Sequence, residues 1–339
     1  MLAIDRWVPD WLRINRVKSE DSTAVYISTA GVAVAKATRV DDRYLLNLRA
    51  DPIERLADAG PVLKTQCQAI GLKGRACNLV LAPELYSLSL IEKPSVADDE
   101  LRDAVRWRMR ENLEYPVDEA TLDVFAMPES AVRDRPMVFV VAIQTQSLKM
   151  LLEKVYAAGI GVVSVDISEL ALRNIVHGLY PAADQGVGLL RMTGSSSVIN
   201  ISRGEELFLS RRISGVPIDD ITWEDMRERL LLQVQRSIDY YESAMSQPPC
   251  NGLLVATTHG WQDRVCEYLG EMMPLPVRPL NDELRALFDI CLHNPDPVNL
   301  NWDHLASVHR NALAATLPAL GGVLRNIPGW KQSLEDVAA

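Results

Sequence analysis

The chain has 339 residues, of which 48% are hydrophobic and 24% are charged, and its formal net charge is -10. That length exceeds what one small core needs, so two lobes or closely packed subdomains are expected. The acidic balance disfavours a nucleic-acid partner, because phosphate binding needs lysine and arginine concentrated on one face.

In chain order, hydrophobic periodicity and capping residues first predict strands that alternate with helices. The first half is expected to hold strands at 23–28, 31–38 and 44–48, a helix from Asp51 and Pro52 to about Gly71, strands at 77–82 and 86–91, a charged helix capped by Ser95, a strand at 137–143, a helix at 147–158, a strand at 162–166 and a helix at 168–177.

The second half repeats this opening after a polar break at 182–186. It is expected to hold strands at 187–192, 197–202 and 206–212, a long helix capped by Thr222 or Asp220 and reaching Met245, a strand at 252–257, a helix at 262–273, an edge strand at 277–280, and a helix at 302–313 before a Gly321-Gly322 turn. The order of elements predicts mixed sheets covered by helices, an α/β fold.

Arginines recur at every fourth position of the charged helix, at Arg102, Arg106 and Arg110. Residues four apart share one helix face, so the sequence predicts a basic ridge in an acidic protein. Two interpretations stay open. The ridge is either a partner-docking surface or a solvated face whose arginines pair with acids along the same helix, at Asp98, Asp99, Asp103 and Glu114.

Cysteine and histidine usage predicts no metal site and no disulfide framework. The five cysteines have no Cys-x-x-Cys spacing, and Cys291, His293, His304 and His309 match no structural zinc pattern. The first nineteen residues are interrupted by charges, and the apolar run at 312–324 is too short to cross a bilayer. A cytoplasmic protein is therefore expected.

Three segments carry a family resemblance through their order and spacing. They are KPSVADDELRDAVRWRMRENLEYPVDEATLDVFAMP at 93–128, VDISELALRN at 165–174 and QRSIDYYES at 235–243. Together they resemble the MshI family of MSHA-type pilus biogenesis, which is related to PilM of type IV pili and to the cytoplasmic part of GspL. The resemblance covers roughly residues 26–280. It implies a degenerate two-lobed actin-like ATPase fold, an α/β fold of the duplicated RNase H-like kind.

The resemblance also implies a domain division. The expected parts are an N-terminal segment at 1–22, a first lobe at 23–181 with an inserted subdomain at about 50–130, and a second lobe at 182–339.

ATP-binding relatives hold phosphate and magnesium with two hairpin turns that carry aspartates, and here the resemblance implies loss of that chemistry. The degenerate nucleotide-binding positions would be Ser28, Thr29, Gly194, Ser195 and Ser196. No Asp lies between Ala24 and Arg39, and Arg191-Met192-Thr193 replaces Asp-Ile-Gly. The relatives' glycine-rich adenosine loop is replaced by residues 256–260. We therefore expect a pseudo-ATPase with no catalytic residues and no cofactor, since phosphoryl transfer depends on the metal and positioned amides.

The expected function is a cytoplasmic, non-catalytic scaffold of pilus assembly. The resemblance implies a PilN-like single-span inner-membrane protein as partner, bound by its cytoplasmic tail near Arg102, Arg106 and Arg110, and so a peripheral position at the inner membrane. A pilus motor ATPase is a second candidate partner. The alternative is an ATPase or kinase of the same superfamily that uses ATP and magnesium.

Overall fold

A computed structural model of the chain describes residues 22–40, 43–97, 99–131, 135–193, 196–213, 222–258, 260–292 and 302–325. The predicted N-terminal segment at 1–22 lies outside the described residues apart from Ser22. In the described ranges, every helix is either too short or too polar to span a lipid bilayer.

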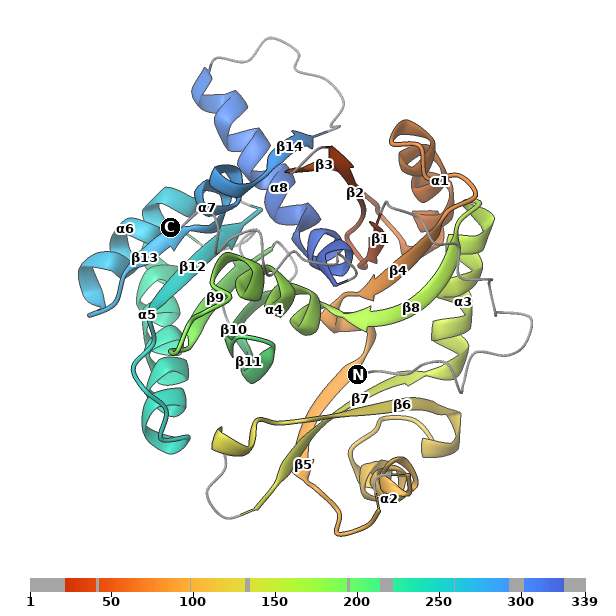
Figure 1. Cartoon of the computed structure of the whole chain (residues 1–339), viewed down its shortest axis with the longest axis vertical. Helices are drawn as coiled ribbons and strands as arrows, with labels where there is room; N and C mark the ends of the chain where they lie inside the picture. Colours follow the sequence, from red (N-terminus) through yellow and green to blue (C-terminus); the bar gives the residue numbers. More distant parts are fainter. Residues whose placement is uncertain are drawn as a thin grey trace.

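The described strands form three sheets, with helices packed between and around them (Figure 1). The strands are β1 (Ser22–Ile27), β2 (Gly31–Val40), β3 (Arg43–Pro52), β4 (Ala76–Leu81), β5 (Ser87–Glu92), β6 (Ala120–Ala126), β7 (Met137–Gln144), β8 (Gly161–Ile167), β9 (Val187–Met192), β10 (Ser197–Arg203), β11 (Glu206–Ile213), β12 (Gly252–Thr257), β13 (Val277–Pro279) and β14 (Asp289–Leu292).

The α-helices are α1 (Ala59–Ala69), α2 (Leu101–Arg108), α3 (Thr145–Ala157), α4 (Ser168–Leu179), α5 (Trp223–Asp239), α6 (Gln262–Met272), α7 (Leu280–Leu287) and α8 (Trp302–Leu324). Short 3-10 turns are η3 (Leu56–Asp58), η4 (Pro83–Leu85), η5 (Met109–Glu111), η6 (Val117–Glu119) and η7 (Glu129–Ala131), and a π-helical turn, η8 (Tyr240–Ala244), continues α5.

The first sheet has the strand order β14-β3-β2-β1-β4-β8. As predicted, β1, β2 and β3 form an antiparallel meander, and β4 and β8 continue the sheet in parallel. Helices α1 and α3 cover one face through a core that includes Leu63 and Val155. Helices α4 and α8 cover the other face.

The second sheet has the order β11-β10-β9-β12-β13 and also opens with an antiparallel meander. Helices α5 and α6 cover one face, where Ile238 of α5 is 5% exposed. Leu189 on the opposite face shares a core with residues of α4 and α8. These two helices therefore lie between the two larger sheets (Figure 1).

Helix α8 packs against its neighbours through two glycines. A Cβ atom at Gly321 would lie 1.9 Å from the carbonyl oxygen of Ala171 on α4, and a Cβ at Gly322 would lie 2.7 Å from Val80 Cγ2 on β4. The predicted turn at these glycines is wrong, because both lie inside α8. Their missing side chains let the helix backbone contact α4 and the sheet.

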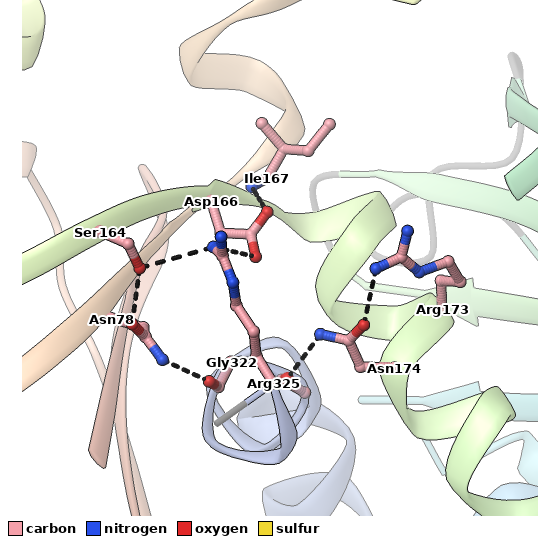
Figure 2. A network of polar contacts seen from close by, with 9 residues as sticks. Asn78, Ser164, Asp166, Ile167, Arg173, Asn174, Gly322 and Arg325 are labelled. Carbon is pink, nitrogen blue, oxygen red and sulfur yellow. Dashed lines mark hydrogen bonds and ion pairs between the residues drawn. The ribbon is translucent and has the colours of Figure 1, made fainter. Parts of the chain in front are cut away.

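Polar contacts fix the same end of α8, as Figure 2 shows. Asn174 and Asn78 donate from Nδ2 to the carbonyls of the two helix glycines, at 3.1 and 2.8 Å. Arg325 forms an ion pair of 3.1 Å with Asp166, whose side chain is 3% exposed. Burial raises the pKa of Asp166, and the charge of Arg325 opposes that rise.

The third sheet, β5-β7-β6, is inserted in the chain between β4 and α3. Helix α2 and the turn η5 cover one face through Val105 and Met109, respectively. On the other face, Val141 packs with Leu207 of β11. Figure 1 shows α2 at the outer end of this sheet, away from the two larger sheets.

Two predicted helix starts are wrong. Asp51 and Pro52 end strand β3, and the helix that follows begins at Ala59. The Asp51 carboxylate accepts from Arg49 and Gln66, so tertiary contacts replace the predicted cap. The charged helix has Glu100 at its N-cap position instead of Ser95.

Two parts of the predicted domain division can be compared with the structure: the inserted subdomain and the end of the second lobe. The inserted sheet runs from β5 to β7, residues 87–144, whereas α1 packs on the first sheet. Strand β14 pairs with β3 and α8 covers the first sheet, so this part of the predicted second lobe returns to the first. The division at residues 181 and 182 stays a prediction.

Candidate functional site

The β1–β2 turn contains two of the predicted nucleotide positions, Ser28 and Thr29. Ser28 Oγ donates to the Gly31 carbonyl at 2.7 Å and accepts from the Gly31 amide at 2.9 Å. These contacts close the turn on itself. Gly31 is also constrained, since a Cβ there would lie 3.1 Å from the Asp51 carbonyl oxygen.

Thr29 at the tip of this turn already binds an anionic group of the chain. Its amide and its hydroxyl contact the same Oε1 atom of Glu84, at 2.9 and 3.2 Å. Glu84 belongs to η4, directly after β4. A backbone N–H paired with a hydroxyl is a typical receptor for an oxyanion, and here a carboxylate accepts both.

The β9–β10 turn contains the other predicted nucleotide positions. Gly194 and Ser195 lie outside the described residues. The Thr193 amide donates to the Ser196 carbonyl at 2.8 Å, and the Ser196 amide donates to Thr193 Oγ1 at 3.1 Å. The Ser196 amide is therefore used within the turn.

Arg191 replaces the aspartate expected before the second turn, and it lies between the two larger sheets. It extends from β9 with 6% of its surface exposed, and its Nε donates to the Ala314 carbonyl of α8 at 3.4 Å. Its guanidinium carbon lies 5.6 Å from the centre of the Tyr26 ring on β1. One buried cation thus contacts the second sheet, the first sheet and the helix between them.

The charges around Tyr26 show how these groups share one region. Burial raises the pKa of Tyr26; the Arg191 charge opposes this rise, and the Glu84 charge adds to it. Both ionic side chains therefore act on the same phenol. We call the region formed by Tyr26, Glu84 and Arg191 the junction. It contains the Glu84 carboxylate at the first turn and the Arg191 guanidinium on the strand before the second turn.

The region after β12, where relatives have an adenosine loop, leads into packed aromatic rings. Thr258 donates its amide to the Met192 carbonyl at 3.0 Å, while His259 lies outside the described residues. Trp261 then packs edge to face on Trp223 of α5, with ring centres 6.1 Å apart, and Tyr268 contacts the same ring at 5.8 Å. Side chains fill this surface of α5 and α6.

Sequence reasoning missed a buried pair at the start of α4. Tyr86 donates its hydroxyl to Glu169, and burial raises the pKa of that carboxyl group. Ser168 beside it donates to the Leu81 carbonyl at 2.8 Å. Glu169 lies in the segment at 165–174 that carries part of the family resemblance, but Tyr86 is 83 positions away in the chain, so no local signal could pair them.

The three arginines predicted to dock a partner do not form one free ridge. Arg102 forms an ion pair of 2.9 Å with Asp123 on β6. Arg106 donates from one nitrogen to the carbonyls of Val117 and Ala120, at 2.8 and 3.1 Å. Both arginines thus contact η6 or β6, while Asp98 lies outside the described residues, so its predicted pairing along the helix stays a prediction.

Arg110 differs from the other two because it is exposed. Its guanidinium carbon lies 5.0 Å from the ring centre of Trp107, which is itself 69% exposed. The three arginines predicted to bind a partner therefore differ in environment. Arg102 and Arg106 contact neighbouring elements of the inserted subdomain, whereas Arg110 is exposed on the surface of that subdomain. The role of these three arginines in binding a partner stays a prediction.

We expect Arg106→Glu to lower the free energy of unfolding by about 2 kcal/mol, because it removes two charge-assisted hydrogen bonds and places a carboxylate beside two carbonyl oxygens. Urea unfolding followed by circular dichroism measures the change. Arg110→Glu on the exposed face is the control and should stay within about 0.5 kcal/mol of the parent. Equal effects of the two substitutions would contradict the inward role of Arg106.

Within the described residues, no three His, Cys, Asp or Glu side chains lie close enough together to hold a metal ion.

Comparisons with known protein structures identify the fold of the chain. No protein-family model matches the chain, and no curated protein sequence does. Among solved structures, the PilM-PilN type IV pilus biogenesis complex matches with a TM-score of 0.67 and 17% identity, over 92% of this chain and 99% of that chain. A Bacteroides thetaiotaomicron protein of unknown function, described as having an actin-like ATPase fold, matches with a TM-score of 0.50 and 10% identity, over 79% and 95%. The chain has the actin-like ATPase fold.

The predicted two-lobed actin-like fold class is thereby confirmed. A further match is the cytoplasmic domain of EpsL, an inner membrane component of the type II secretion system of Vibrio cholerae, with a TM-score of 0.46 and 14% identity over 86% and 94%.

Proposed function

We propose that this chain is a non-catalytic scaffold of type IV pilus assembly, of the MSHA kind and MshI-like, that binds the cytoplasmic tail of a PilN-like inner-membrane protein. It would work in the cytoplasm, at the face of the inner membrane where that partner is anchored. A pilus motor ATPase is a second candidate partner. The structural likeness to the PilM-PilN complex supports this assignment, because it covers 92% of this chain and 99% of the matched chain.

The contact between Thr29 and Glu84 carries the non-catalytic part of the proposal. The amide and hydroxyl that would receive an oxyanion at the first turn are already engaged by a carboxylate. A second anion at the same donors would meet the charge of Glu84, which is repulsive unless a cation intervenes. Arg191 replaces the carboxylate that would position such a cation, and the guanidinium would repel it.

Partner binding is tested by affinity capture from solubilised inner membranes with the tagged full chain, followed by titration of the captured protein's purified tail. We expect recovery of a single-span protein with a short cytoplasmic tail, and saturable binding of that tail. Capture that yields no single-span protein, or a tail that does not bind in the purified system, would contradict the proposed role.

We predict that the purified chain shows no magnesium-dependent ATP hydrolysis above background, and that ATP with magnesium does not raise its melting temperature. The reason is that the Thr29 donors of the first turn already contact Glu84 and the Ser196 amide of the second turn is used within that turn, whereas a ligand that binds the native state must stabilise it. Phosphate release and differential scanning fluorimetry provide the measurements. A Ser196→Ala variant separates intrinsic turnover from contamination: activity present in the parent and lost in this variant would establish the ATPase alternative.

A further inference from the structure

The segment of α2 and η5 presents an exposed aromatic ring, and most of its exposed charged residues are acidic. Trp107 is 69% exposed, more than the other large hydrophobic side chains that the structure describes as exposed. Arg110 lies over its ring. Trp and Arg are the residue types most enriched at the centres of protein interfaces, because they contribute large contact areas.

The exposed charged residues of this segment are mostly acidic, contrary to the basic ridge that the sequence predicted. Arg102 pairs with Asp123 and Arg106 with two carbonyls, and both are only partly exposed; the exposed bases between residues 99 and 119 are Arg108 and Arg110. The exposed acids in the same range are Asp99, Glu100, Asp103, Glu111, Glu114, Asp118 and Glu119. Exposed acids therefore outnumber exposed bases in this segment.

Two of these acids flank the indole along the helix. Asp103 precedes Trp107 by four positions within α2, where residues four apart are surface neighbours, and Glu111 follows Trp107 in the 3-10 turn η5. All three side chains are exposed. Arg110 already lies over the indole, so a cationic side chain that approaches Trp107 would be attracted mainly by the neighbouring carboxylates of Asp103 and Glu111.

We propose that the surface formed by Asp103, Trp107, Arg110 and Glu111, here called the Trp107 surface, binds a lysine- and arginine-bearing cytoplasmic tail of a single-span membrane protein. This inference rests on the proposed function and specifies the charge of its partner. The cytoplasmic flanks of membrane-spanning helices carry an excess of lysine and arginine, which matches an acidic surface with an aromatic anchor. The partner's charge is thus opposite to the one that three free arginines would require.

The probes are three synthetic peptides of equal length and common leucine positions, whose remaining variable positions are all lysine, all glutamate or all serine. Each is titrated into the full chain by isothermal calorimetry at low and high salt. We expect the lysine peptide to bind, with an affinity that falls as salt rises, and the glutamate peptide to bind least.

Trp107→Ala should weaken the lysine peptide by about tenfold, because truncating an exposed interface anchor removes most of its contact area. Asp103→Lys combined with Glu111→Lys should weaken it by about tenfold as well, and should flatten the salt dependence. The matched control is Glu228→Lys combined with Glu267→Lys, which changes the net charge equally on exposed positions of α5 and α6. This control should keep the parent affinity.

Equal binding of the glutamate peptide, equal loss in the control, or no binding by any peptide would overturn the inference. Binding of the parent to anionic lipid vesicles in place of the lysine peptide would overturn it too. Affinity capture with the Trp107→Ala chain separates the two proposals. If parent and variant recover the same single-span protein equally, the Trp107 surface is wrong while the scaffold role stands, and if the parent recovers none, the scaffold role fails.

Discussion

Replacing Gly321 by alanine is expected to lower the free energy of unfolding by about 4 kcal/mol, an effect reached by substitutions that overpack a core against rigid backbone. The added Cβ would lie 1.9 Å from the carbonyl oxygen of Ala171 and 2.4 Å from its carbonyl carbon. Both atoms belong to the backbone of α4, so rotation of a side chain cannot relieve the contact. The two central helices would have to separate.

That separation would weaken several contacts at once. Asn174 of α4 donates to the Gly321 carbonyl, and Leu317 and Leu320 of α8 share a core with α4 and both larger sheets. Urea unfolding followed by circular dichroism measures the loss. Local separation without global unfolding would appear as faster amide hydrogen exchange in α4 and α8.

Gly270 provides the control, because it also lies inside a helix but in an open position. A Cβ there would meet its nearest atom, Val277 Cβ, at 4.0 Å. Gly270→Ala should be neutral, or stabilising by up to about 1 kcal/mol, since alanine favours the helix over glycine. A Gly321→Ala chain as stable as the Gly270→Ala chain would contradict the close contact between α4 and α8.

Elements whose patterns are local could be predicted from the sequence. The strands expected at 187–192 and 252–257 coincide with β9 and β12, because continuous apolar runs bounded by polar turns identify buried strands. Of the two predicted caps of α5, Thr222 and Asp220, the structure has Thr222 at the N-cap, with its hydroxyl accepting from the Asp225 amide. A cap is visible in sequence because donor and acceptor lie within one helical turn.

Elements set by distant contacts could not be predicted. Two adjacent glycines are typical of a turn, but Gly321 and Gly322 lie inside α8 because α4 and β4 approach its backbone. The periodicity of Arg102 and Arg106 gave the correct helix face but the wrong environment. Their acceptors lie on β6 and η6, and no local signal places those elements beside α2.

The candidate site shows the same limit. The first turn at Ser28 and Thr29, and the absence of an aspartate there, could be identified from the sequence. It did not reveal that Glu84, 55 positions away, supplies a carboxylate to that turn. Loss of a residue is readable in one sequence, whereas replacement of its contacts by another part of the chain requires the fold.

Arg191→Asp, which introduces the aspartate of ATP-binding relatives, is expected to destabilise the chain by about 3 kcal/mol or more, the cost typical of an uncompensated buried charge. The position is 6% exposed. A carboxylate there would face the Tyr26 ring and the Ala314 carbonyl, and the negative charge of Glu84 acts on the same region. Urea unfolding again measures the effect.

Arg191→Met distinguishes the effect of charge from that of volume. Methionine keeps much of the side-chain length and removes a buried cation that has no carboxylate partner among the contacts described, so its cost should be about 1 kcal/mol or less. The decisive comparison adds magnesium and ATP to the Arg191→Asp chain. If the junction is closed by its own charges, neither ligand raises the melting temperature, because Glu84 still engages the Thr29 donors. A magnesium-dependent rise would show that one substitution restores a metal site between the lobes, and it would support the nucleotide-binding alternative.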